Sequence, residues 1–326
     1  MSSLVRSARR AATIAVFFVL LAGFPQLGQD FYTELVTRVM IMSIFALSLD
    51  LLVGYTGLIS FGHAAWFGMG GYVFALLGTR YQVTSNLWLT LPAAMAVTAF
   101  FSFVVGLFVL RTRGMFFIMV TLAFAQIFYF FFHDVKALGG SSDGMNLRAK
   151  PTTNIGEWIP FELSDTNTFY YLVMVLLAGL LLFMTLLLRS PLGRALQGIR
   201  ENEHRMEAIG FPVPRYKLAA FTLSGSFAGL AGYLFAVLNS SVNPEMLSWH
   251  QSADGLLMLI LGGLGQLWGG VIGAFSFVLL QEVLSSFTKQ WHLWLGIAIV
   301  LLVLFLPGGM ISIFERIKGI WKRRFA

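Results

Sequence analysis

The sequence lacks cysteine altogether and is poor in charge. The absence of cysteine from all 326 residues excludes disulfide frameworks, thiol catalysis, zinc–thiolate sites and lipid attachment to cysteine. Charged residues make up 11% of the chain, whereas about 25% is ordinary for proteins. Because a water-soluble domain of this size could not cover its surface with so few charges, the composition indicates a polytopic membrane protein.

Apolar runs fill most of the chain, which is 57% hydrophobic with a mean hydropathy of +0.78. A helix needs about 20 apolar residues to cross the hydrocarbon core. Clear spans are expected at residues 35–53, 87–110, 115–132, 169–188 and 218–238. Shorter or glycine-interrupted spans are expected at residues 11–24, 58–77, 253–264, 268–284 and 293–307. The sequence therefore predicts an all-α polytopic membrane protein with about ten transmembrane crossings, folded as one domain over residues 1–326.

The basic residues predict the orientation, because cytoplasmic loops are enriched in Lys and Arg. With the N-terminus inside and ten crossings, 16 of the 22 basic residues fall on the cytoplasmic side. These are Arg6, Arg9, Arg10, Arg111, Arg113, Arg189, Arg194, Arg200, Arg205, Arg215, Lys217, Arg316, Lys318, Lys322, Arg323 and Arg324. The net charge of +7 is thus mostly a topogenic signal, and nucleic-acid binding loses its support.

Both termini are accordingly predicted to be cytoplasmic. A cleaved signal peptide would resemble the basic start of the chain, but no convincing small-x-small cleavage site follows the first apolar run, so we expect this helix to be retained. The basic tail at 316–326 would lie near anionic lipid of the bilayer, and 133–168 forms an outer loop. Ten crossings divide into five plus five, which allows an inverted repeat. Glycine-rich segments at 54–71 and 262–273 roughly correspond in the two halves, although coincidence is an alternative.

Residues 190–210 predict a cytoplasmic amphipathic helix. Ser190 is a good N-cap with Pro191 at the first helical position, and Gly210 marks the end. One interpretation places the helix flat on the bilayer. The other docks it on a partner protein, which suits its mixed charge better, because its glutamates would be repelled by anionic lipid. The candidate docking residues are Arg194, Arg200, Glu201, Glu203 and Arg205.

A second informative segment, residues 54–72, holds six glycines. Small residues allow close helix packing in membranes, and glycine also permits a broken helix that lines a cavity. His63 is either bound by a neighbouring carbonyl or in contact with a solute, and Asp50 is either an inward-facing polar contact or a cap on the Gly54 loop. Candidate translocation-path residues are Asp50, Gly54, Ser60, Gly62, His63, Gly70 and Gln126.

No catalytic pattern accompanies these segments. The chain has no HExxH or GxSxG motif and no ligand-spaced histidine cluster, and the glycine-rich stretch at 139–144 lacks the lysine spacing of a phosphate-binding loop. We therefore expect no catalytic residue, no metal and no cofactor. If transport is active, its energy must come from another protein.

The ordered motifs resemble those of the permease subunits of branched-chain amino-acid ABC importers, most of all the M-type member of the usual permease pair. The carrying motifs are LLVGYTG (51–57), SFGHAA (60–65), TLAFA (121–125), GGSSDG (139–144), SPLGRA (190–195), IRENE (199–203), GGLG (262–265) and PGG (307–309). The resemblance implies a second homologous permease, two cytoplasmic ATPase subunits that hydrolyse ATP, an extracytoplasmic binding protein and a place in the bacterial plasma (inner) membrane. The resemblance also implies that 190–210 is the coupling helix, which sits on an ATPase subunit. Asn202 stands where an acidic residue is common in the family.

The resulting hypothesis is a multi-pass permease subunit that forms part of the path for a small polar solute and is not itself an enzyme. Branched-chain or other amino acids are the expected solutes, while urea, short amides and aromatic acids are alternatives within the family. The rival hypothesis is a stand-alone secondary transporter or channel. Such proteins usually carry several intramembrane charges for ion coupling, whereas here Asp50 is nearly alone.

Overall fold

The computed structural model describes residues 18–19, 21–28, 30–135, 144–147, 150–154, 162–163, 165–305 and 308–310. This part of the chain is all-α except for a small ribbon. In the ribbon, strands β1 (Met145–Asn146) and β2 (Ser241–Val242) pair antiparallel, with Met145 opposite Val242. The predicted basic tail and most of the first apolar run lie outside the described residues.

Helices account for the remaining elements. In chain order they are η1 (Phe24–Leu27), α2 (Asp30–Thr56), α3 (His63–Phe74), η2 (Ala75–Arg80), α4 (Leu87–Val109), α5 (Met115–Asp134), α6 (Thr166–Arg189), α7 (Pro191–Glu201), α8 (Glu203–Ala208), α9 (Val213–Asn239), η4 (Pro244–Leu247), α10 (Trp249–Gly262), α11 (Leu267–Phe287) and α12 (Trp291–Phe305).

Six of the described helices are long and apolar enough to cross a membrane: α2, α4, α5, α6, α9 and α11. Five of them confirm the five clear spans expected from the sequence. The sixth, α11, has 21 residues and extends beyond the shorter span expected at 268–284. By contrast α3, α10 and α12 have 12, 14 and 15 residues, which is less than the roughly 20 that a full crossing needs.

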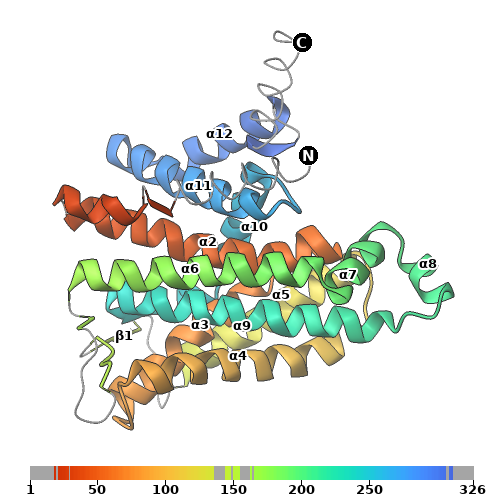
Figure 1. Cartoon of the computed structure of the whole chain (residues 1–326), viewed down its shortest axis with the longest axis horizontal. Coiled ribbons are helices and arrows are strands. Elements are labelled where there is room, and N and C mark those ends of the chain that lie inside the picture. The colour runs from red at the N-terminus through yellow and green to blue at the C-terminus, as the bar shows by residue number, and fades with distance from the viewer. Residues whose placement is uncertain are drawn as a thin grey trace, which may run out of the picture.

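Helix α2 is the centre of the bundle. Every residue from position 39 to position 56 is buried. Helices α6 and α9 pack along α2, with α3 and α4 packed in turn on α9, while α10 and α11 contact α2 as well. Figure 1 shows α2, α6, α9 and α4 running alongside one another, with α10, α11 and α12 gathered on the other side of α2.

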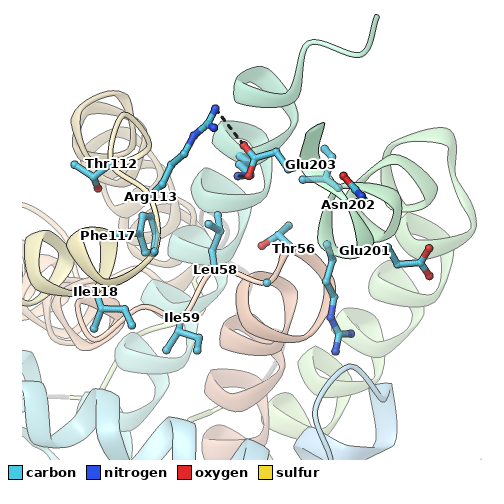
Figure 2. Close-up of a pocket in the computed structure, with 15 residues that line it drawn as sticks. Thr56, Leu58, Ile59, Thr112, Arg113, Phe117, Ile118, Glu201, Asn202 and Glu203 are labelled. Atoms are coloured by element: carbon cyan, nitrogen blue, oxygen red, sulfur yellow. Dashed lines mark ion pairs between the residues drawn. The ribbon is translucent and has the colours of Figure 1, made fainter. Parts of the chain in front are cut away.

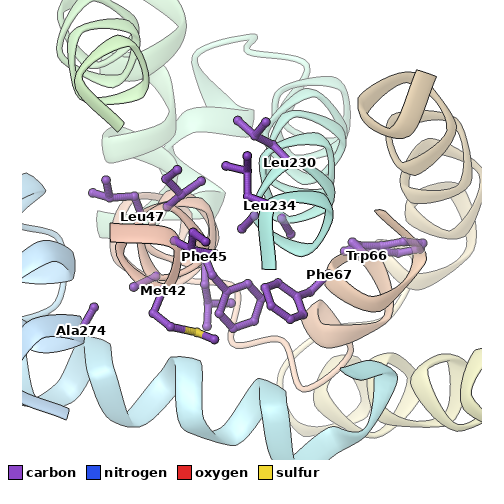
Figure 3. Close-up of a cluster of buried hydrophobic side chains, with 14 of the residues drawn as sticks. Met42, Phe45, Leu47, Trp66, Phe67, Leu230, Leu234 and Ala274 are labelled. Atoms are coloured by element: carbon purple, nitrogen blue, oxygen red, sulfur yellow. The ribbon is translucent and has the colours of Figure 1, made fainter. Parts of the chain in front are cut away.

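The core between these layers is aromatic and aliphatic. The rings of Phe45 on α2 and Phe67 on α3 lie 4.8 Å apart, and Phe67 lies 5.3 Å from the ring of Phe235 on α9. Figure 3 shows Phe45 and Phe67 facing each other, with Leu230 and Leu234 of α9 beside them. Aromatic pairs at such distances add to the free energy of burial.

Glycine lets α3 approach the backbone of α9. A Cβ on Gly70 would lie 2.6 Å from the carbonyl carbon of Gly229, and a Cβ on Gly232 would lie 2.5 Å from the carbonyl carbon of Phe67. Real side chains do not tolerate such distances. The two helices therefore pack backbone to backbone, which is the close packing that small residues allow in membranes.

The segment expected as one helix over 190–210 is two helices, so that prediction was wrong. Its caps are confirmed: the Ser190 hydroxyl accepts a hydrogen bond from Gly193 N–H at 3.3 Å, and Gly210 has φ of +90°. Between them Asn202 is extended, with φ −159° and ψ 101°. Its side-chain oxygen accepts from Arg205 N–H at 3.0 Å. Asn202 therefore caps a second helix, as asparagine commonly does.

Replacing Gly70 by leucine is expected to lower the free energy of unfolding by about 3 kcal/mol, because the new side chain would overpack against backbone that cannot yield. The matched control is Gly179→Leu on α6, where an added Cβ meets nothing within 4 Å. Thermal unfolding of both purified variants in detergent measures the difference. Equal melting temperatures would show that α3 and α9 do not touch at this point.

Candidate functional site

The helical structure is interrupted between α2 and α3, and this break runs from exposed residues at Gly57 and Ile59 to buried ones at Ser60 and Gly62. After α2 ends at Thr56 the chain turns back over residues 57–62, and Leu58 N–H donates to the Leu52 carbonyl at 3.0 Å. His63 then begins α3, with its Nε2 2.9 Å from the Ser48 hydroxyl. Ser48 lies about two turns before the C-terminal end of α2. The first residue of α3 therefore lies beside the interior of α2 and not beside its end.

Side chains from distant segments satisfy the backbone at this break. Ala64 N–H donates to the Ser252 hydroxyl of α10 at 2.8 Å, and Phe61 N–H donates to the Thr121 hydroxyl of α5 at 3.3 Å. A Cβ on Gly62 would lie 3.0 Å from the Thr121 carbonyl carbon. The break is consequently held by α2, α5 and α10 together.

The seven candidate path residues fall into separate places. Ser60, Gly62 and His63 are buried at the break, and Gly70 lies two turns further along α3 against α9. Asp50 and Gly54 form a second group near the end of α2. Gln126 is half-buried further along α5.

Asp50 binds the loop between α10 and α11. Its residue is 1% exposed, and its Oδ1 accepts from Gly265 N–H at 2.9 Å. A Cβ on Gly54 would come within 2.6 Å of the Gly265 nitrogen. The carboxylate thus joins two layers of the bundle through a buried hydrogen bond.

A hollow of about 320 Å³ opens at the end of the bundle where α7 and α8 lie. The loop after α2, the turn between α4 and α5, the α7–α8 break and the start of α9 line it (Figure 2). None of the seven candidate path residues is among its lining residues. Figure 2 shows Glu201 extending away from Leu58 and Phe117, whereas Glu203 turns toward Arg113.

Ion pairs fix α8 to its neighbours beside the hollow. Lys217 Nζ of α9 lies 2.7 Å from Glu203 Oε2, and the Lys217 side chain is only 11% exposed. Arg113, in the turn before α5, lies 3.3 Å from Glu207 and 3.8 Å from Glu203. Because Arg113 is 62% exposed, its pairs are screened and contribute little. The Glu203–Lys217 pair is the stronger tie.

The five candidate docking residues therefore differ in what they can reach. Arg194, Glu201 and Arg205 are exposed and form the outward charged face of α7 and α8, which we call the docking surface. Glu203 is engaged by Lys217. Arg200 Nη1 donates to the Gly54 carbonyl at the end of α2.

Lys217 and Arg113 were missed as site residues. The sequence does carry a signal for Lys217, since it lies on the same face of α9 as the buried Val213, Ala220 and Phe221. A lysine on an apolar face needs an acidic partner. No comparable signal exists for Arg113, whose partners lie in a distant segment.

Comparisons with known proteins agree with the resemblance seen in the motifs. The family described as "Branched-chain amino acid transport system / permease component" matches residues 31–306. The chain belongs to this family. It is therefore a multi-pass membrane protein and a permease component, not an enzyme.

Individual relatives cover most of the chain. The permease protein LivM of the high-affinity branched-chain amino acid transport system is 33% identical in both Salmonella typhimurium and Escherichia coli, over 91% of this chain and 74% of each relative. The LivH permease protein of Salmonella typhimurium is 22% identical over 83% of this chain and 91% of its own length. No solved structure is a significant match.

Replacing Lys217 by methionine is expected to lower the free energy of unfolding by about 2 kcal/mol, because it removes a charged hydrogen bond and leaves the Glu203 carboxylate with only the exposed Arg113 as a charged partner. Chemical denaturation in detergent measures the loss. The double variant Lys217→Met with Glu203→Gln should lose less than the sum of the single variants. As a control, Arg113→Gln should cost about 1 kcal/mol or less. If the losses of the two single variants simply added up in the double variant, Lys217 and Glu203 would not interact.

Proposed function

We propose that this chain forms half of the translocation path of an ATP-binding-cassette importer in the bacterial inner membrane, carrying branched-chain or other small amino acids inward. The observation that carries the proposal is the docking surface. Arg194, Glu201 and Arg205 project from two short capped helices between α6 and α9, at one end of the bundle. A mixed-charge surface there suits a protein partner better than anionic lipid.

The partners follow from the same family membership. Two cytoplasmic ATPase subunits would bind the docking surfaces of two permeases, and an extracytoplasmic binding protein would deliver the solute. The second permease would be a homologue of this chain. Similarity to both LivM-type and LivH-type relatives supports a pair of related permeases in one transporter.

Helix lengths support a topology of about ten crossings arranged as a five-plus-five inverted repeat with both termini cytoplasmic. Helix α2 has 27 residues and is followed by a break and the 12-residue α3. Helix α9 also has 27 residues and is followed by a break and the 14-residue α10. The packing partners correspond as well, since α4 packs along α9 while α11 packs along α2. A pseudo-two-fold repeat is expected to pack the fourth crossing of each half against the second crossing of the other half in this way.

Transport in this proposal needs no covalent chemistry and no cofactor in the permease. ATP binding closes the two ATPases, the docking surfaces move with them, and the two permeases rock between inward-open and outward-open states. The Glu203–Lys217 ion pair between α8 and α9 would carry that motion into the bundle. The binding protein would then set much of the solute specificity.

Replacing both Glu201 and Arg205 by alanine is expected to abolish ATPase co-purification and ATP-driven uptake, while leaving membrane insertion intact. Radiolabelled leucine uptake into proteoliposomes that contain both permeases, both ATPases and the binding protein is the measurement. The matched control is Glu245→Gln with Lys289→Gln, an exposed acid and base outside α7 and α8, and it should co-purify the ATPases as the wild type does.

Two results would contradict the proposal. Unchanged co-purification and uptake in the Glu201/Arg205 variant would show that the ATPases do not bind the docking surface. Uptake by this chain alone, without ATPases or ATP, would instead identify a stand-alone transporter.

A further inference from the structure

Arg200 differs from Arg194 and Arg205, the other arginines of α7 and α8, in the partner of its side chain. Arg194 and Arg205 belong to the docking surface, whereas Arg200, which is also exposed, directs its Nη1 to the Gly54 carbonyl, to which it donates. That carbonyl lies in the last turn of α2, where the C-terminal end of a helix carries partial negative charge. A guanidinium bound there forms a charge-assisted hydrogen bond, which is stronger than a neutral one.

The loop between α10 and α11 meets the same point. Gly265 has φ of +72°, and an added Cβ would lie 2.6 Å from Arg200 Nη1 and 2.9 Å from the Gly54 oxygen. Its N–H donates to Asp50 at 2.9 Å. Asp50, Gly54, Arg200 and Gly265 therefore form one contact between three segments, which we call the Arg200 junction.

The loop at this junction has little freedom to move independently. Gly263 has φ of +116°, and a Cβ on Gly309 would lie 2.6 Å from the Gly263 nitrogen. At the start of α11, a Cβ on Gly269 would lie 3.2 Å from the Gly263 carbonyl carbon. Backbone this closely packed transmits displacement because its neighbours leave no room for local adjustment.

The position of the junction connects the two sides of α2. Helix α7 packs on α2, α6 and α9, whereas α10, α11 and α12 form the group on the other side of α2. Arg200 extends the contact of α7 to the loop of that second group. A displacement of α7 thus acts on the end of α2 and on the α10–α11 loop at once.

We propose that Arg200 is a positioning residue that makes α7, the end of α2 and the α10–α11 loop move as one body when the ATPases close. This rests on the proposed importer function and assigns Arg200 an internal role, not a direct contact with the ATPase. The motion of the docking surface then reaches α10, α11 and α12 through the Arg200 junction, and it reaches α9 through the Glu203–Lys217 ion pair.

Three variants of the full transporter complex in proteoliposomes test the role. Arg200→Gln is expected to retain assembled ATPases and ATP hydrolysis but to lower leucine uptake per ATP hydrolysed by about tenfold, the effect of one lost charged hydrogen bond. Arg200→Lys should recover part of the ratio, because an ammonium can donate to the Gly54 carbonyl. The matched control Arg215→Gln removes an exposed arginine at the start of α9 and should keep the wild-type ratio.

Equal ratios for Arg200→Gln and Arg215→Gln would overturn the proposal. So would loss of ATPase co-purification in Arg200→Gln with purified subunits that remain folded, because that result would make Arg200 a docking residue. Absence of ATP-driven uptake by the unmodified complex would overturn the proposed function, and this proposal with it.

A distance measurement with Arg200 in place covers the case in which Arg200→Gln does not fold. The chain has no cysteine, so spin labels can be attached at Gln197→Cys on α7 and Leu264→Cys in the α10–α11 loop, both exposed positions. Pulsed electron spin resonance of the assembled complex should give the same distance without nucleotide and with the ATPases trapped closed. A change in that distance would overturn the proposal.

Discussion

Backbone amides and carbonyls exposed at a helix break find no water inside a membrane bundle, so the protein itself must supply their partners. The break after α2 meets this constraint through side chains of α5, α10 and α2 itself. Thr121 of α5 and Ser252 of α10 accept the free N–H groups, and Ser48 of α2 binds His63. The position of α3 therefore depends on α2, α5 and α10 together, and the core between Phe45 and Phe67 forms on that arrangement.

The few buried charged residues of the bundle likewise need partners within the protein. Buried Asp50 accepts a hydrogen bond from Gly265 N–H, and nearly buried Lys217 pairs with Glu203. A buried charge without its partner is strongly destabilising, so each of these residues restricts how its segments can move. The restrictions gather at the end that carries α7 and α8. They would convert force applied to two short helices into motion of a whole bundle.

Long apolar runs made the sequence informative about most spans. Five helices were predicted to within about six residues at each end, because hydrophobic length is a strong local signal. The caps at Ser190 and Gly210 were predicted for a similar reason, since each depends on its own residue type. The break at Asn202 was missed because the apolar stripe continues through it, and only the side-chain hydrogen bond to Arg205 N–H reveals the second helix.

The candidate sites could be predicted less well, because residue type does not distinguish packing from function. Gly70 and Gly62 were selected as possible path residues, yet the structure places both against backbone of neighbouring helices. Arg200 and Glu203 were grouped with Arg205 as docking residues, and the structure adds that Arg200 binds the Gly54 carbonyl and that Glu203 pairs with Lys217. Those partners are far away in the chain, and tertiary contacts of that kind leave no periodic pattern.

The central claim is that the end of the bundle with α7 and α8 faces the ATPases in the cytoplasm. A single cysteine at His204, whose side chain is 82% exposed, tests it in this cysteine-free chain. The cysteine should cross-link to an ATPase subunit and should resist a membrane-impermeant maleimide added to intact cells, whereas a cysteine at Glu245 should react with that reagent. Labelling at position 204 from outside the cell, without any cross-link to the ATPase, would contradict the account.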